Sequence, residues 1–168
     1  RGGVAYSAEG NIVFPAASTG VVFCPSTHKQ NFAQHNTDAI LSLAVSADGR
    51  FAASGELGRR PRVCVWDTSS MALLAVLRGR LSNGVTQLAF SPDGRSLACV
   101  SPATVGTIEW TAVAVYDWAS ESLLWEGRLH RGAIHGLCFG ADEDSDAIAA
   151  AAAAEEQRKE DIAEAVHK

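Results

Sequence analysis

The chain has 168 residues, a formal net charge of −5, 47% hydrophobic residues and 20% charged residues. This composition is typical of a folded globular protein rather than a disordered chain, and the acidic balance argues against a protein that coats nucleic acid. No apolar run reaches the roughly 18 residues of a membrane-spanning helix, so we expect no membrane partner. Because the chain begins at Arg1 rather than at a methionine, we expect it to be a piece of a longer protein.

In chain order, the predicted elements are short β-strands. Each is an apolar, β-prone run bounded by Asp-Gly, Pro or Ser turns. Three come first, at 11–17, 20–24 and 29–33. Two sets of four follow, at 40–45, 51–54, 63–67 and 72–77, and then at 85–90, 96–100, 113–117 and 122–125. A last predicted strand covers 133–139.

A turn recurs together with the strands around it. Ser46-Ala47-Asp48-Gly49-Arg50 returns 45 positions later as Ser91-Pro92-Asp93-Gly94-Arg95. In such a turn the Asp side chain accepts hydrogen bonds from the backbone that follows it, and Gly adopts the positive φ at which the hairpin reverses. We therefore expect structural roles for four residues, namely Asp48, Gly49, Asp93 and Gly94.

The third strand of each full repeat ends on an aromatic residue followed by Asp, as Trp66-Asp67 and as Tyr116-Asp117. Four strands in each period of about 40–45 residues, with a Trp-Asp pair, are the sequence signature of a propeller blade. The predicted fold class is therefore all-β. It is a partial β-propeller with two near-complete and two partial blades, and the blade boundaries fall near residues 36, 81 and 131.

At these residues the chain resembles the WD-repeat β-propellers. Trp66-Asp67 stands for the dipeptide that gives the family its name, and His35 stands at the position of a family histidine. The resemblance implies that His35, Ser54 and Trp66 form a hydrogen-bonded set. In the next repeat Arg80 replaces the His and Tyr116 replaces the Trp, so we expect that set to be absent there.

A narrower resemblance rests on the loop Gly55-Glu56-Leu57-Gly58-Arg59-Arg60-Pro61, on the strand 63–67 and on Tyr116-Asp117-Trp118. These residues are similar to the echinoderm microtubule-associated protein-like family and to flagellar and centriolar WD-repeat proteins. The resemblance implies a microtubule-associated protein of the cytoskeleton, in a cilium, flagellum or centriole. Its implied partners are tubulin, the microtubule or other axonemal proteins.

The order of strands in a blade also sorts the charged residues onto two faces. If the strands run a-b-c-d from the axis outward, the d–a and b–c loops emerge on one face and the a–b and c–d turns on the other. The first face is basic, and the second collects mostly Asp and Glu. We expect the basic face to bind an acidic partner, because complementary fields steer association. Its arginines are Arg59, Arg60, Arg62, Arg78, Arg80, Arg128 and Arg131.

The pattern changes near the C-terminus. Residues 1–146 are predicted to form the propeller arc, whereas 147–168 are rich in Ala and Glu, contain no Gly or Pro and favour an α-helix. Two interpretations remain open for this helix. It is an insertion between strands of the last blade, or it follows a gap in the chain.

No catalytic motif is present, and the four Cys have no metal-ligand spacing, so we expect no enzyme, no cofactor and no metal. Each Cys lies in an apolar run, which predicts reduced, buried thiols and a cytoplasmic protein. The sequence therefore favours a non-catalytic WD-repeat scaffold on microtubules. The alternative is a general WD-repeat adaptor in another assembly, such as a ubiquitin ligase or a trafficking complex.

Overall fold

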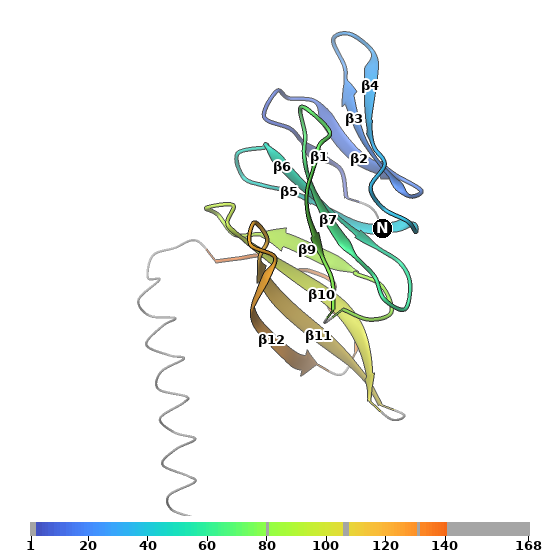
Figure 1. Cartoon of the computed structure of the whole chain (residues 1–168), viewed down its shortest axis with the longest axis vertical. Helices are drawn as coiled ribbons and strands as arrows, with labels where there is room; N and C mark the ends of the chain where they lie inside the picture. The colour runs from blue at the N-terminus through green and yellow to red at the C-terminus, as the bar shows by residue number, and fades with distance from the viewer. Residues whose placement is uncertain (1–2, 80, 106–107, 131, 141–168) are drawn as a thin grey trace, which may run out of the picture.

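Three antiparallel sheets make up the regular structure of the described residues, which are 3–79, 81–105, 108–130 and 132–140 of the computed structural model (Figure 1). Each sheet has four strands, and each strand pairs with the next one in the sequence. Blade A contains β1 (Ala5–Tyr6), β2 (Ile12–Ala16), β3 (Thr19–Cys24) and β4 (Lys29–Ala33). Blade B contains β5 (Ile40–Val45), β6 (Phe51–Glu56), β7 (Val63–Asp67) and β8 (Leu73–Leu77). Blade C contains β9 (Gln87–Phe90), β10 (Ser96–Val105), β11 (Ile108–Asp117) and β12 (Ser122–His130).

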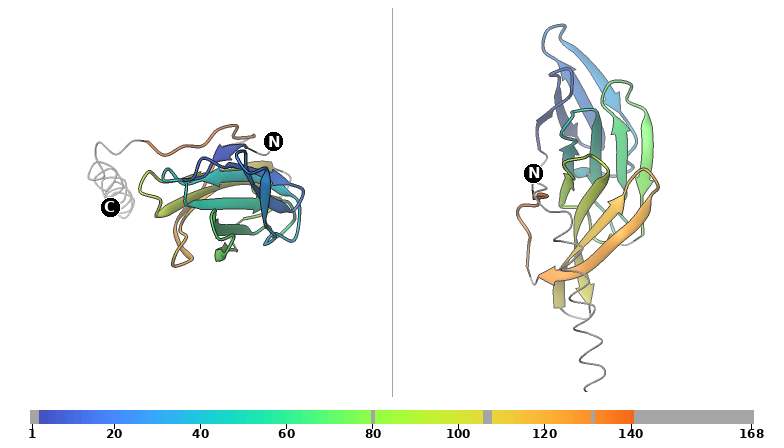
Figure 2. Two further views of the ribbon diagram at one scale, coloured as in Figure 1. Left: turned by 90° about the horizontal axis from the view of Figure 1, so that it is seen from above. Right: turned by 90° about the vertical axis from the view of Figure 1, so that its left-hand side faces the viewer.

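The blades follow one another along the molecule, with blade B between the other two (Figures 1 and 2). Their first strands lie side by side, because β5 contacts both β1 and β9. The fourth strand of each blade lies at the far edge of its sheet. This radial order, with the first strand inside and the fourth outside, is that of propeller blades.

Strand β7 explains how the blades hold together. Successive side chains of a strand point to opposite faces of its sheet. Cys64 and Trp66 therefore enter the core between blades A and B, whereas Val63 and Val65 enter the core between blades B and C. All four side chains are fully buried, so both faces of blade B are covered, and β7 contains no polar residue before its final Asp.

The two repeated turns have the same hydrogen bonds. Asp48 Oδ1 accepts from Ser46 Oγ at 2.6 Å and from Arg50 N at 3.1 Å, and Asp93 Oδ1 accepts from Ser91 Oγ at 2.5 Å and from Arg95 N at 3.0 Å. These hydrogen bonds from serine and from the backbone hold the pKa of both carboxyl groups below its ordinary value. Gly49 and Gly94 have φ of 73° and 72°, in the left-handed region that favours glycine.

The first blade has an inner strand that the sequence prediction missed. Strand β1 is only two residues long and pairs with β2 in the register Ala5↔Val13 and Tyr6↔Ile12. The turn that joins them, 7–11, reads Ser-Ala-Glu-Gly-Asn and is a third copy of the repeated turn. Gly10 N donates to Ser7 O at 2.9 Å, as Gly49 N donates to Ser46 O at 2.8 Å in blade B.

The last predicted elements have different outcomes. Strands β10 and β11 continue well beyond the predicted 96–100 and 113–117, since they pair as a hairpin from Ser96↔Asp117 to Val105↔Ile108. Residues 132–140, in contrast, contain no strand, so the inner strand predicted at 133–139 is not formed in this structure. The helix predicted at 147–168 lies outside the described residues.

The four cysteines differ in their burial. Cys64 and Cys99 are buried, but Cys24 is half-buried and Cys138 is exposed, so the prediction of four buried thiols is wrong for the last two. All four are free thiols. Within the described residues, no helix has the length and apolar character needed to cross a membrane.

Candidate functional site

A buried carboxylate lies at the end of β6, where the b–c loop of blade B begins. The Glu56 side chain is only 4% exposed, and its Oε1 lies 3.0 Å from Arg62 Nε. Oε1 also accepts a hydrogen bond from Arg62 N at 3.2 Å. The two residues therefore close the loop 57–61 from both ends with an ion pair and a backbone hydrogen bond.

The same ion pair ties this loop to the connection between blades A and B. Arg62 Nη2 donates to His35 O at 3.0 Å and to Thr37 Oγ1 at 2.9 Å. Thr37 N donates to Glu56 Oε2 at 3.0 Å. Loops from two blades thus share one polar cluster of Glu56, Arg62, His35 and Thr37.

The pKa values in this cluster follow from the ion pair. Burial acts to raise the pKa of Glu56, but the hydrogen bonds from the Arg62 side chain and from Thr37 N–H outweigh it and hold that pKa below its ordinary value. The hydrogen bond to Glu56 raises the pKa of Arg62. Both groups are therefore charged at neutral pH, and their charges compensate each other.

Three arginines line a pocket beside this cluster. The pocket has a volume of about 430 Å³ and is here named the arginine pocket; it is lined by Arg60, Pro61, Arg62, Arg78, Gly79 and Leu81. Pro61 and Leu81 are buried and form its apolar part, whereas Arg60 and Arg78 are exposed. No hydrogen bond or ion pair joins Arg60 or Arg78 to another residue within the described part of the chain. The pocket therefore presents two uncompensated positive charges next to an apolar surface.

The other predicted arginines have different places. Arg59 is exposed in the same loop but does not line the pocket. Arg128 lies within the outer strand β12, opposite Ala112, and not in a loop as the sequence predicted. Arg80 and Arg131 lie outside the described residues. Arg62 pairs with Glu56, and its side chain is only 16% exposed.

The implied hydrogen-bonded set is only partly as expected. Trp66 Nε1 donates to Ser54 Oγ at 3.3 Å, and Ser54 Oγ donates to Asn36 Oδ1 at 2.6 Å. His35 lies outside this chain of hydrogen bonds, because its Nε2 lies 2.8 Å from Met71 O. Asn36 therefore takes the place that the resemblance gave to His35.

The two Asp residues that follow the aromatic positions close the c–d turns. Asp67 Oδ1 accepts hydrogen bonds from the backbone N–H groups of Ser69 and Ser70 at 2.9 and 2.8 Å, and Asp117 Oδ1 accepts from Ala119 N at 3.1 Å. Hydrogen bonds from the Ser69 hydroxyl and from Ser70 lower the pKa of Asp67 to about 2. Tyr116 is buried in the core between blades B and C. These residues have structural places at the end of the blades opposite the arginine pocket.

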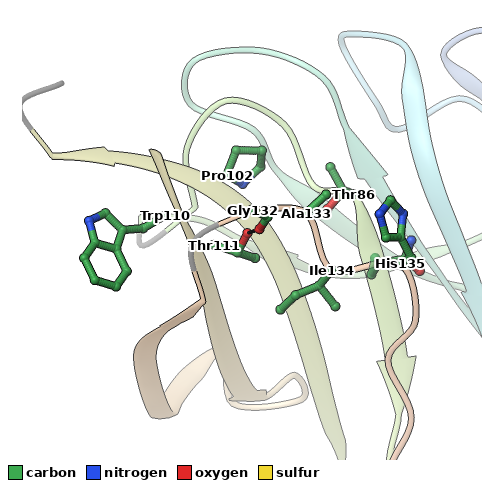
Figure 3. Close-up of a pocket in the computed structure, with 9 residues that line it drawn as sticks. Thr86, Pro102, Trp110, Thr111, Gly132, Ala133, Ile134 and His135 are labelled. Carbon is green, nitrogen blue, oxygen red and sulfur yellow. Dashed lines mark hydrogen bonds between the residues drawn. The ribbon is translucent and has the colours of Figure 1, made fainter. Parts of the chain in front are cut away.

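A second pocket of about 380 Å³ lies on blade C, where residues 132–135 pass the ends of β10 and β11 (Figure 3). Thr111 Oγ1 donates a hydrogen bond to Gly132 O and fixes this crossing. Trp110 and His135 lie at opposite ends of the pocket (Figure 3). Among the described residues that line it, His135 is the one titratable side chain.

The polar cluster was missed by sequence reasoning, although one signal was available. Glu56 directly follows four small residues of a strand that is buried along most of its length, and a carboxylate in such a place requires a partner. The partner follows six residues later, across the loop. Among the described residues, no group of three or more His, Cys, Asp or Glu side chains is placed to hold a metal ion.

The comparisons with known proteins agree with this architecture. Residues 26–67 and 71–105 match the family described as WD domain, G-beta repeat. A chain of the "Crystal Structure of Mitotic Checkpoint Complex" superposes with a TM-score of 0.66 and 17% sequence identity, over 81% of this chain and 39% of that one. The stacked four-stranded sheets are blades of a β-propeller, and the two matched segments are WD repeats.

Within this class, several relatives have names that refer to cilia, centrioles or microtubules. The chain is 31% identical over 111 residues to Cilia- and flagella-associated protein 52 of Macaca fascicularis, over 64% of this chain and 19% of the relative. It is 39% identical over 72 residues to Centriole proteome protein 16 of Chlamydomonas reinhardtii, over 43% of this chain and 3% of the relative. It is 29% identical over 135 residues to Echinoderm microtubule-associated protein-like 2 of Rattus norvegicus, over 74% of this chain and 20% of the relative. The chain therefore spans a fifth or less of the length of these relatives.

Proposed function

We propose that this chain is part of a non-catalytic scaffold of microtubule-based structures, located in the cytoplasm at a cilium, flagellum or centriole. The arginine pocket supports this function most directly, because it offers uncompensated positive charge on the face where the d–a and b–c loops emerge. An acidic protein surface, such as that of tubulin, would be attracted to it. The names of the three relatives described above support the same location in the cell.

We propose that a smaller part of the predicted basic face makes the contact. Arg62 holds the loop in place through Glu56, and we propose that Arg60 and Arg78, which line the arginine pocket, make the main contacts with the partner. The opposite end of blade B, at the turn 46–50, carries the exposed Arg50, and the equivalent turn of blade C carries Arg95. These two arginines provide a comparison of equal charge on the other face.

The experiment is co-sedimentation of the full-length protein with microtubules at several salt concentrations. Charge reversal in Arg60→Glu/Arg78→Glu should weaken binding and flatten its salt dependence, because the number of ionic contacts falls. Arg50→Glu/Arg95→Glu makes the same charge change on the opposite face and should leave binding close to that of the unmodified protein. Equal losses in both double variants, or no microtubule binding at all, would contradict the proposal. The second result together with capture of a short peptide motif would favour the general adaptor.

A further inference from the structure

The arginine pocket has features of a specific recognition site as well as of a charged surface. Resting on the proposed function, we propose that it receives acidic side chains of an extended peptide segment of the partner. In this arrangement Arg60 and Arg78 bind the carboxylates. Arg62 is a positioning residue, which holds the loop 57–61 in place through Glu56.

The first argument is the distribution of charge among the three arginines. Arg62 already forms an ion pair with Glu56 and donates to His35 O and Thr37 Oγ1. Arg60 and Arg78 have no such partner among the described residues, and both are exposed. A guanidinium group presents a planar set of donors that matches a carboxylate in bidentate geometry. Two uncompensated guanidinium groups therefore correspond to two carboxylates of one peptide.

The second argument is that the framework of the pocket is fixed before any ligand binds. Pro61 is buried and has a fixed φ, and it is followed directly by Arg62, whose side chain is anchored. On the other wall, Arg78 follows Leu77, which is 1% exposed at the end of β8. Gly79 then turns the chain away with φ of 106°. On the side of this protein, binding therefore requires ordering of the Arg60 and Arg78 side chains, which limits its share of the entropic cost.

The third argument concerns the kind of ligand. A volume of about 430 Å³ holds one or two side chains and is too small for the face of a duplex or a bilayer. A short acidic peptide can place its carboxylates in the pocket while it remains far from the acidic turns at the other end of the blades. The pocket thus favours a peptide rich in Glu or Asp.

The test measures binding of a fluorescein-labelled hexaglutamate peptide to the full-length protein by fluorescence anisotropy at constant ionic strength. Arg60→Gln/Arg78→Gln should weaken binding at least about tenfold, since charge-assisted hydrogen bonds to two guanidinium groups are lost. Arg59→Gln is the matched control, because Arg59 is exposed in the same loop and does not line the pocket. It should change the dissociation constant by less than about threefold, which is the effect of one exposed charge. A hexaglutamine peptide should not bind.

Two results would overturn the inference. One is a loss in Arg59→Gln as large as that in the double variant, which would show a diffuse field instead of a pocket. The other is tight binding of a phosphoserine peptide in place of hexaglutamate, which would show that the site is built for phosphate.

If the double variant loses its far-ultraviolet circular dichroism, Arg60→Lys and Arg78→Lys replace it. They keep the charge but lose the bidentate geometry, and unchanged affinity in both would contradict the role assigned to the two arginines.

The same variants separate this inference from the proposed function. Microtubule co-sedimentation without hexaglutamate binding would leave the proposed function standing and overturn the pocket as its acidic-peptide site. Hexaglutamate binding that depends on Arg60 and Arg78, without any co-sedimentation, would support the pocket and contradict the assignment to microtubules.

The variant Arg62→Gln tests the positioning role of Arg62. Its effect should come through the loop, so hydrogen exchange at 57–61 should rise together with the loss of peptide affinity.

Discussion

Glu56 Oε1 lies 3.0 Å from Arg62 Nε, and the two side chains are only 4% and 16% exposed. This contact spans a six-residue separation in the chain, but its hydrogen bonds reach the connection that enters blade B from blade A. The loop that carries Arg60 is therefore fixed by an ion pair that is itself largely removed from solvent. We therefore expect the position of Arg60 to depend on Glu56.

Replacement of Glu56 by Gln should destabilise the protein by about 2–4 kcal/mol, because it leaves the buried Arg62 charge without its partner. Urea unfolding, followed by circular dichroism, measures this change. Arg62→Gln should also destabilise, and the double variant should lose about 1–3 kcal/mol less than the sum of the two single losses. Additive losses would show that the two residues act independently, in conflict with the geometry.

The glycines of the two repeated turns should respond differently to alanine. A Cβ at Gly49 would lie 2.3 Å from Ala8 N, in the neighbouring turn of blade A, whereas a Cβ at Gly94 would meet no heavy atom within 4 Å. Both residues have a positive φ, which costs an alanine about 1 kcal/mol. Gly94→Ala should lose about that amount, and Gly49→Ala should lose several kcal/mol. Melting temperatures of the two variants provide the comparison, and equal losses would argue against the close contact of the two turns.

Gly20 should be required by the indole ring of Trp66. A Cβ at Gly20 would lie 2.6 Å from Trp66 Cζ2, which is part of the fully buried ring between blades A and B. Gly20→Ala should therefore destabilise by about 1–3 kcal/mol through overpacking. Gly136→Ala is the control, since its Cβ meets nothing within 4 Å. Thermal unfolding should leave this control unchanged, and a second substitution, Trp66→Phe, should relieve part of the loss in Gly20→Ala.

Asp67 should make the protein sensitive to acid. Its pKa is lowered from 3.8 to about 2 by hydrogen bonds from Ser69 and Ser70, so its contribution to stability is complete above about pH 5 and is lost as the pH falls toward 2. Ser69→Ala removes the hydrogen bond of 2.6 Å from the hydroxyl group and should raise the pKa of Asp67. Carbon-detected NMR titration of the Asp67 carboxyl group measures this shift. An unchanged titration in Ser69→Ala would contradict this explanation of the low pKa.

Local sequence signals account for most of the fold. Asp48-Gly49 and Asp93-Gly94 specify turns through their own hydrogen bonds and positive φ, so they could be assigned without any knowledge of distant residues. Trp66 could be assigned to a buried position because β7 has apolar residues on both faces. Strand β1 was missed because two residues give no periodicity, and because Glu9 stands where the other turns have Asp.

The candidate site was less predictable because its geometry depends on contacts between loops. Sequence reasoning counted Arg62 with the exposed arginines, although a single neighbouring carboxylate, Glu56, removes it from solvent. It also placed His35 in the hydrogen-bonded set by similarity to other repeats, whereas a shift of one position brings Asn36 to Ser54. Glu56 and Arg62 are brought together by the loop between them, and Asn36 reaches Ser54 in β6 from the connection between blades A and B. Composition and spacing do not determine such contacts.

The burial of β7 on both faces has a consequence for how the opening of the blades can be followed. Cys64 belongs to the core between blades A and B, and Cys99 belongs to the core between blades B and C. Burial raises the pKa of both thiols, that of Cys64 to about 11, so neither reacts while its own core is closed. In a protein whose more accessible thiols, Cys24 and Cys138, have been changed to serine, the alkylation rates of Cys64 and Cys99 would time the separation of each pair of blades independently. Each of the two contacts between the described blades thus contains a native chemical reporter.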